Sequence, residues 1–256
     1  MRRTWKNILG GAVALALLTV AFGSSAFASA AVVEAGRAPG AATSETAPDA
    51  AVTKEKEYTQ MITVAGSGMD SSHVQVTYYK KDSEGQWAEQ FSVPGYCGHN
   101  GMSYDKKEGD RKTPIGTYSF TTAFGVYADP GSVIPYKVLD QNDYWVDDSS
   151  SQFYNQMVNT KTTAKTWNSA EHLIGVLPQY HYALALNYNT ENPVPGKGSA
   201  IFLHGYHTYK TWTEGCIAIP EEKMKLLLQN VDTDTQIVIA PDQGTLSTML
   251  TGNLAL

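Results

Sequence analysis

Short segments in which apolar and polar residues alternate recur through most of the chain, and they constrain its fold more than any other feature. Successive residues of a strand point to opposite faces, so a period of two is typical of half-buried β-strands. Clusters of Gly, Pro, Asn and Asp separate the segments, as expected for turns. The predicted strands are residues 58–64, 74–79, 87–93, 115–121, 134–139, 182–187, 200–204 and 235–240. The sequence therefore predicts a mainly β domain.

One segment, residues 220–231, has a helical pattern instead. Pro220 suits the first turn of a helix, where its missing N–H is not needed. The apolar residues fall at the spacing that gathers them on one helical face, namely Met224, Leu227, Leu228 and Val231. We expect this helix to pack one face against the sheet.

The segment 141–172 is polar and interrupts the succession of strands. Trp145 and Trp167 are dispersed there among Ser, Thr and Asn residues. Segments of this length without secondary structure are uncommon inside domains and are often functional. We predict a long loop or insertion that contains at most a short helix.

The N-terminus has the features of an export signal. Arg2, Arg3 and Lys6 precede an apolar run over residues 8–22, which small residues follow up to residue 30. The run is shorter than the ~20 residues that span a bilayer, so we expect cleavage and no stable membrane insertion. Residues 31–57 contain no aromatic residue and are rich in Ala, Thr, Pro and Glu, which predicts a flexible linker. We expect residues 58–256 to form the folded domain of an exported protein.

The charge of the chain argues against one class of partner. The formal net charge is −6, and removing the three basic residues of the predicted signal leaves −9. Nucleic-acid-binding domains carry the opposite balance, because they neutralise phosphates with Lys and Arg. We therefore expect no nucleic-acid partner.

A histidine and a cysteine stand at the ends of two predicted strands, twelve residues apart. Alternation places Phe202 and His204 on one strand face, and a strand that starts after Cys216 can bring its thiol close to that face. A free thiol has a pKa of about 8.5, so it needs a base to act as a nucleophile at neutral pH. We expect His204 to be that base, Cys216 the nucleophile, and the backbone N–H groups of Gly215 and Cys216 an oxyanion hole.

Other roles for these residues remain open from their spacing alone. The two cysteines of an exported chain, Cys97 and Cys216, could form a disulfide. His204 could be a hydrogen-bonded structural histidine. A zinc site could be formed by His204, His207 and Cys216 with the nearby pair Cys97 and His99, although the spacing matches no short zinc motif. A cysteine enzyme with a reactive thiolate would alkylate well below the pKa of a free thiol, which a module with a decayed site would not, and a zinc peptidase would instead be inhibited by chelators.

Two motifs resemble those of a known enzyme family. His204-Gly205 is followed by Thr213-Glu214-Gly215-Cys216, an apolar strand and a helix, and a Thr-Pro-x-Gly-Thr segment lies upstream at 113–117. This order is similar to that of the L,D-transpeptidases with a YkuD-type catalytic domain, bacterial enzymes that act on peptidoglycan. The resemblance extends over about residues 93–241. It implies a YkuD-like β-sandwich or mixed sheet with one helix after the cysteine.

The resemblance also implies a reaction, acyl transfer between peptidoglycan stem peptides. Cys216 would attack the third stem residue, D-Ala would leave with a proton from His204, and an amine of a second stem would resolve the thioester to a 3-3 cross-link. A backbone carbonyl would orient His204, and Thr213, Gly205 and Tyr206 would contact the substrate. No metal or cofactor is implied, and we expect a monomer that serves cell-wall biogenesis and cell shape.

The alternatives are an L,D-carboxypeptidase, in which water resolves the thioester, and a wall-binding module with a decayed site. A sortase would have a longer His-to-Cys separation and a downstream arginine, and papain-like wall enzymes place the cysteine before the histidine.

The motif departs from that of many members at two positions. Glu214 stands where they have histidine, and Ala218 stands where they have arginine or asparagine. A carboxylate next to a thiolate would raise the thiol pKa, so we expect Glu214 to face solvent. The aromatic side chains between the histidine and the cysteine could either wall the cleft or pack as ordinary aromatic residues; they are Tyr206, His207, Tyr209 and Trp212.

Overall fold

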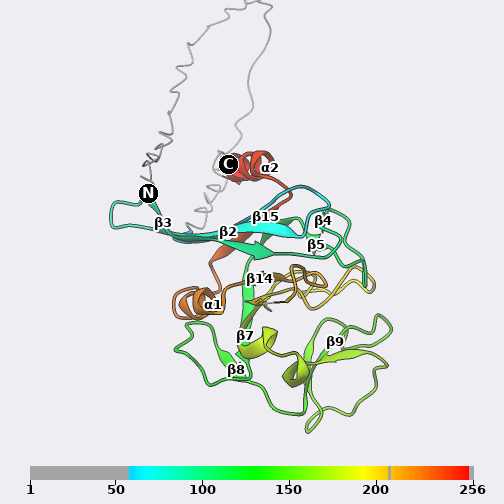
Figure 1. Cartoon of the computed structure of the whole chain (residues 1–256). Coiled ribbons are helices and arrows are strands. Elements are labelled where there is room, and N and C mark those ends of the chain that lie inside the picture. Colours follow the sequence, from blue (N-terminus) through cyan, green and yellow to red (C-terminus); the bar gives the residue numbers. More distant parts are fainter. Residues whose placement is uncertain (1–57, 207–208, 254–256) are drawn as a thin grey trace, which may run out of the picture. The chain divides into compact units, whose positions relative to one another are not determined.

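A long mixed sheet forms the centre of the computed structural model, which describes residues 58–206 and 209–253 (Figure 1). Its strands are β1 (Gln60–Gly66), β2 (His73–Lys81), β3 (Trp87–Tyr96), β6 (Gly116–Tyr118), β7 (Phe120–Gly125), β8 (Tyr136–Val138), β12 (Ala183–Leu186), β13 (Phe202–Gly205), β14 (Ile217–Ile219) and β15 (Gln236–Ala240). The ten strands lie in the order β6-β15-β1-β2-β3-β14-β13-β12-β7-β8. The predicted signal and linker, residues 1–57, lie outside the described residues.

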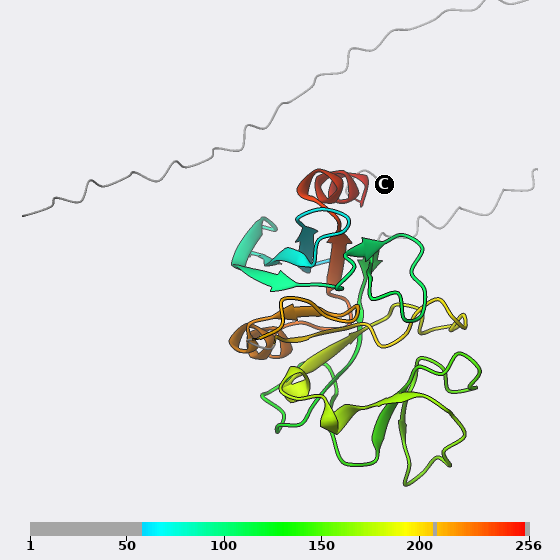
Figure 2. The same ribbon diagram turned by 45° about the vertical axis from the view of Figure 1, so that its right-hand side comes forward.

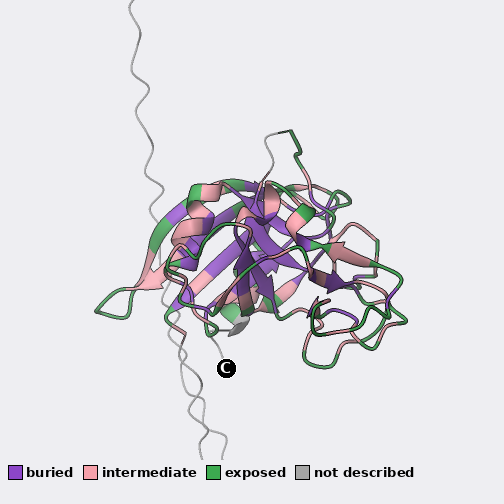
Figure 3. Ribbon diagram, turned by 90° about the horizontal axis from the view of Figure 1, so that it is seen from below, coloured by how far each residue is buried: buried purple, intermediate pink, exposed green. Residues whose placement is uncertain are grey.

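The mainly β fold predicted from the alternation is confirmed. Each of the eight predicted segments contains a strand of the sheet, and β14 is the short strand expected after Cys216. Figure 3 shows the buried residues concentrated in the central strands and the exposed ones in the peripheral loops. The first half of β2 alternates between exposed and buried residues, whereas β12, β13 and β14 are buried on both faces.

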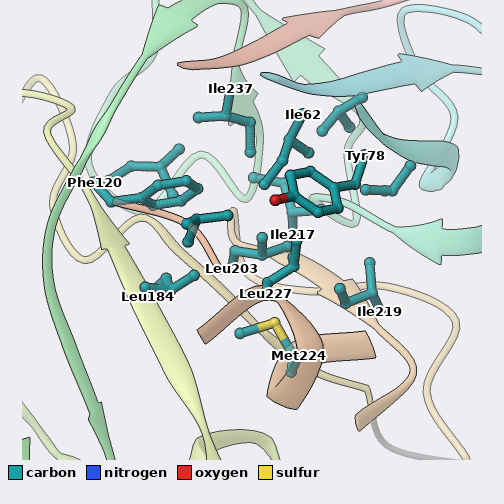
Figure 4. Packing of buried hydrophobic residues seen from close by; sticks show 14 of the residues in the cluster. Ile62, Tyr78, Phe120, Leu184, Leu203, Ile217, Ile219, Met224, Leu227 and Ile237 are labelled. Carbon is teal, nitrogen blue, oxygen red and sulfur yellow. The ribbon is translucent and has the colours of Figure 1, made fainter. Parts of the chain in front are cut away.

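The main core lies where the sheet curls around the first helix, α1 (Glu221–Leu228). Figure 4 shows Met224 and Leu227 of this helix among side chains of the strands. Leu203 of β13 and Ile217 of β14 are fully buried in the same cluster. Burial of each such side chain contributes roughly 1.5–3 kcal/mol. The helical face predicted for 220–231 is thus the face that packs on the sheet.

A second helix, α2 (Gln243–Asn253), corrects the expectation of a single helix. Its sequence mixes Gly and Thr with few apolar residues, so the helical period is weak. Asp242 supplies an N-cap, since its carboxylate accepts a hydrogen bond of 2.8 Å from the Thr245 N–H. Leu246 and Met249 pack on β1 and β15, on the side of these strands away from α1 (Figure 2). No helix among the described residues is long and apolar enough to cross a membrane.

The insertion at 141–172 is present, but it folds into a small antiparallel sheet and contains no helix. Its strands are β9 (Asp143–Val146), β10 (Met157–Asn159) and β11 (Ala170–His172), in the order β10-β9-β11. Trp167 is buried against Val146 and Val158, so the inserted sheet has a small hydrophobic core although most of its sequence is polar. Two 3₁₀ turns, Leu173–Gly175 and Gln179–His181, lead back to β12. A short parallel pair, β4 (Met102–Ser103) and β5 (Thr113–Pro114), completes the fold.

Candidate active site

His204 and Cys216 lie on the same side of two adjacent parallel strands. The pairing of β13 with β14 places His204 level with Ala218 and Leu203 level with Ile217. Leu203 faces the main core, whereas Phe202 and Cys216 belong to a second buried cluster on the opposite face. The alternation predicted for this stretch is therefore confirmed, and it brings the imidazole and the thiol to one cavity.

The imidazole of His204 is held in one tautomer. Its Nδ1 lies 2.7 Å from the carbonyl oxygen of Gly205. A carbonyl can only accept, so Nδ1 carries the hydrogen and Nε2 has a free lone pair. Burial lowers the pKa of His204 to about 4, while the hydrogen bond to Gly205 opposes this shift. At neutral pH the side chain is a neutral imidazole with Nε2 available as a base.

The thiol of Cys216 is buried and protonated in the resting protein. Its Sγ donates to the carbonyl of Ala200 at 3.3 Å and accepts from the N–H of Phe202 at 3.4 Å. Burial raises the pKa of Cys216 to about 12, and the charge of Glu171 adds to this effect. The thiol and the imidazole are thus both neutral before substrate binds. An attack by this thiol on a substrate would require proton transfer to a base, and the neutral imidazole of His204 lines the same cavity.

We therefore expect slow alkylation of Cys216 at neutral pH. With the pKa raised to about 12, the thiolate fraction at pH 7 is smaller than that of a free thiol. The alkylation rate should rise about tenfold per pH unit beyond pH 9 and should not level off near pH 8.5. Iodoacetamide labelling followed by intact-mass spectrometry measures this profile.

The matched control for this labelling is a Cys97→Ala variant, which leaves Cys216 as the only thiol. The denatured variant supplies the reference rate of an exposed thiol. A rate that reaches its plateau near pH 7 in the folded protein would instead indicate a preformed thiolate, and the neutral resting pair would be wrong.

The turn before Cys216 is fixed by two buried threonine hydroxyls. Thr213 Oγ1 donates to the Cys216 carbonyl at 2.6 Å and accepts from the Gly215 N–H at 3.1 Å. Thr113 Oγ1 donates to the Gly215 carbonyl at 2.7 Å and accepts from the Gly98 N–H at 2.9 Å. The upstream Thr-Pro motif therefore meets the cysteine motif in space. The Gly215 N–H donates to Thr213 Oγ1. Of the two N–H groups expected to form the oxyanion hole, only that of Cys216 therefore remains a candidate.

A cavity of about 250 Å³ opens in front of the thiol and the imidazole. Tyr206, Thr213 and Trp212 line it, as do His204 and Cys216. The lining includes two of the three residues expected to contact substrate, although the Thr213 hydroxyl is committed to the turn.

Other expected residues lie around this cavity or away from it. Gly205 is buried behind His204, outside the lining, and its carbonyl orients the imidazole. Glu214 lies at the rim, 62 % exposed, and forms a bidentate ion pair with Arg111 at 2.6 and 3.1 Å. The prediction that Glu214 faces solvent is confirmed. Tyr209 is 88 % exposed and outside the lining, and His207 lies outside the described residues.

Several residues that line the cavity were not predicted from the sequence, and two of them lie close to His204 and Cys216. Glu171 comes from β11 of the inserted sheet, and Tyr180 comes from the 3₁₀ turn that follows it. The Tyr180 hydroxyl donates to Glu171 Oε2 at 2.6 Å, and its ring packs edge-on against His204 at 5.6 Å. Burial raises the pKa of Glu171 to about 7. Neither residue stands in a motif, so only the length of the insertion pointed to this part of the site.

Lys106 is another residue near the site whose role was not predicted from the sequence. Its ammonium is buried behind the Gly215–Cys216 turn, 2.7 Å from the Asp110 carboxylate, and its charge lowers the pKa of Cys216. The spacing Lys106-x-x-x-Asp110 could have indicated an ion pair, but such pairs are common on protein surfaces and do not indicate a site.

The alternative of a disulfide is excluded by the positions of the cysteines. Cys97 and Cys216 are both free and belong to different clusters. Cys97 Sγ donates to the Ser71 carbonyl, and its backbone pairs with Thr213, so this segment supports the turn before Cys216. Among the described residues, no group of three or more His, Cys, Asp or Glu side chains could hold a metal ion.

The family of the chain follows from its sequence and this geometry together. A model of the YkuD family, the L,D-transpeptidase catalytic domain, matches residues 69–239, more than half of the chain. The chain belongs to this family. The resemblance predicted from the His-Gly, Gly-Cys and Thr-Pro motifs is thus confirmed, and the matched segment begins earlier than the motifs indicated. No curated protein sequence matches the chain.

Solved structures with some similarity are distant. The helical cell shape determining protein Pgp2 from Campylobacter jejuni is 18 % identical, with a TM-score of 0.38, over 77 % of this chain and 56 % of that one. A cysteine-to-serine mutant of the Enterococcus faecium L,D-transpeptidase is 12 % identical, with a TM-score of 0.32, over 72 % of this chain and 50 % of that one. This chain thus spans about half the length of the solved proteins it matches.

Proposed function

We propose that this YkuD-family protein is an exported L,D-transpeptidase that forms 3-3 cross-links between peptidoglycan stem peptides through a Cys216 thioester. The observation that carries the proposal is the shared cavity of Cys216 and His204, with Nδ1 of His204 bound to the Gly205 carbonyl. This hydrogen bond leaves Nε2 with a free lone pair, as a base for the thiol requires. The family match to residues 69–239 supports the choice of reaction.

The first half-reaction would load the donor stem. His204 Nε2 takes the Cys216 proton as the sulfur attacks the carbonyl carbon of the third stem residue. The Cys216 N–H stabilises the oxyanion that develops on the carbonyl oxygen. Collapse of the intermediate breaks the peptide bond, and D-Ala leaves with the proton from His204. The product is a thioester on Cys216.

The second half-reaction would resolve the thioester. Attack by the amine of a second stem gives the cross-link, whereas attack by water gives a tripeptide and makes the protein an L,D-carboxypeptidase. Exclusion of water from the cavity favours the amine. The half-buried walls supplied by Tyr206 and Trp212 support this preference.

Muropeptide analysis tests the proposal. Disaccharide-tetrapeptide muropeptides are incubated with the purified protein, and the Cys216→Ala protein serves as the parallel sample. We expect loss of D-Ala and a dimer one D-Ala lighter than two substrates, both visible by mass spectrometry. Tripeptide monomer without dimer would point to the carboxypeptidase. Unchanged substrate, with the thiol shown to be reduced, would favour a wall-binding module.

A further inference from the structure

Glu171 places an acidic group in the cavity of the candidate active site. It stands on β11 and lines the same cavity as Cys216 and His204. Within the described part of the chain, the hydrogen bond from Tyr180 at 2.6 Å is the one that its carboxylate accepts, and no lysine, arginine or histidine pairs with it. An ionised carboxylate can accept about four hydrogen bonds. Most of its accepting capacity is therefore unused.

The carboxylate lies close to the sulfur, with a single side chain between them. The Tyr180 hydroxyl that donates to Glu171 also lies near the Cys216 thiol. The charge of Glu171 raises the pKa of Cys216. A ligand atom bound at Glu171 can thus approach an acyl group on Cys216.

A second hydrogen-bond acceptor lines the same cavity. Gln179 precedes Tyr180, lines the cavity, and has a buried Oε1 without a hydrogen-bond partner among the described residues. Two acceptors with unused capacity match a ligand that brings donors and no acceptor. A protonated primary amine has three N–H donors and a positive charge, so it satisfies both groups. It also offsets the cost of burying the carboxylate, which raises the pKa of Glu171 to about 7 in the empty cavity.

We propose that Glu171 and Gln179 form a subsite for a protonated primary amine, and that this amine is the acyl acceptor of the second stem peptide. The proposal rests on the function proposed above. It assigns to the inserted sheet the task of bringing the acceptor to the thioester.

The proton balance of the step follows from the groups present. The ammonium gives one proton to the Glu171 carboxylate and becomes a nucleophilic amine. Its nitrogen attacks the thioester carbon, so the C–N bond forms and the C–S bond to Cys216 breaks. The second proton of the amine passes to the sulfur through His204 Nε2 and regenerates the thiol. Glu171 then releases its proton to water.

A Glu171→Gln variant tests the catalytic part. Glutamine keeps the size of the side chain and an oxygen that can accept from Tyr180, but it removes the charge. Because the charge of Glu171 also raises the pKa of Cys216, acyl-enzyme formation is measured alongside, and transfer to a free stem amine should fall roughly 10- to 100-fold relative to hydrolysis of the same acyl-enzyme. The ratio of dimer to hydrolysed tripeptide reports this difference. A ratio equal to that of the unmodified protein overturns the assignment.

Glu214→Gln is the matched control, because Glu214 also lines the cavity but is paired with Arg111 at the rim. Its dimer-to-tripeptide ratio should equal that of the unmodified protein. Gln179→Met is the second variant, used if Glu171→Gln does not fold, and it should lower the ratio in the same direction. An equal loss of dimer in Glu214→Gln would mean that overall charge matters and that the subsite is not at Glu171.

A binding measurement separates this inference from the proposed function. A stem tetrapeptide with a free side-chain amine and its N-acetylated form are titrated by calorimetry into the Cys216→Ala protein, which is expected not to consume them, and into the same protein carrying Glu171→Gln. We expect the free amine to bind at least about tenfold more tightly than the acetylated form, and this preference to vanish in the variant. Equal binding of both peptides overturns the subsite, even if acyl-enzyme forms normally. If no acyl-enzyme forms but the free amine still binds more tightly than the acetylated form, the proposed transpeptidation is overturned. The cavity would then be a binding site for amines only.

Discussion

A Cys216→Ala variant should form no acyl-enzyme and release no D-Ala from tetrapeptide stems. Removing the nucleophile of a covalent mechanism can lower kcat by about a million-fold, so we expect a loss of at least ~10⁴-fold. The cost in stability should be only about 1 kcal/mol, because alanine deletes a single buried sulfur. Intact-mass spectrometry measures the acyl-enzyme, and chromatography measures D-Ala. Activity within tenfold of the unmodified protein would place the nucleophile elsewhere.

The partner of this substitution is His204→Gln. It removes the base while Cys216 keeps its hydrogen bonds to the second cluster. Loss of a general base lowers rates by about 10²–10⁴-fold. If the thiol and the imidazole act as one unit, the double variant should be no slower than Cys216→Ala alone. A further drop in the double variant would mean that His204 contributes through a separate path.

The sheet could be predicted from the sequence because its side-chain period reflects burial directly. Alternation placed Leu203 in the core and His204 at a cavity, and the structure agrees. The second helix could not be found by period, since Leu246 and Met249 pack only through tertiary contacts with β1 and β15. Its one local signal was the N-cap at Asp242. The sequence thus predicts a strand or helix whose apolar residues recur at a regular spacing. It does not predict one, such as α2, that is stabilised mainly by packing on other elements.

The candidate site divides in a similar way. His204 and Cys216 could be predicted because the residue types and strand ends carry their chemistry. Glu171 could not, since it reaches the cavity through the pairing of β11 with β9, which no sequence spacing specifies. Thr113 stood in a quoted motif, yet its contact with the Gly215 carbonyl is 102 residues away in the chain. The residues that position the thiol are therefore the ones that required the three-dimensional structure.

A Gly215→Ala variant should lose both stability and activity, because a Cβ at this position strains the backbone and requires its neighbours to shift. Gly215 has a φ of +146°, which L-residues with a Cβ rarely adopt. An added Cβ would lie 3.0 Å from the Lys112 carbonyl oxygen and 3.3 Å from the Ile201 side chain. Backbone strain of this kind costs about 1–3 kcal/mol. Shifting the turn moves the Cys216 sulfur relative to His204, and a displacement of about 1 Å can cost roughly 100-fold in rate.

Gly68→Ala is the matched control, because it separates backbone strain from the geometry of the site. Gly68 has a similar φ of +133°, but an added Cβ would have no heavy atom within 4 Å. We expect this variant to lose stability through strain alone and to keep the acylation rate of the unmodified protein. Thermal unfolding and acyl-enzyme formation are measured for both variants at a temperature where each is folded. If Gly215→Ala acylates as fast as Gly68→Ala, the turn tolerates movement, and the close fit around Cys216 is not what positions the nucleophile.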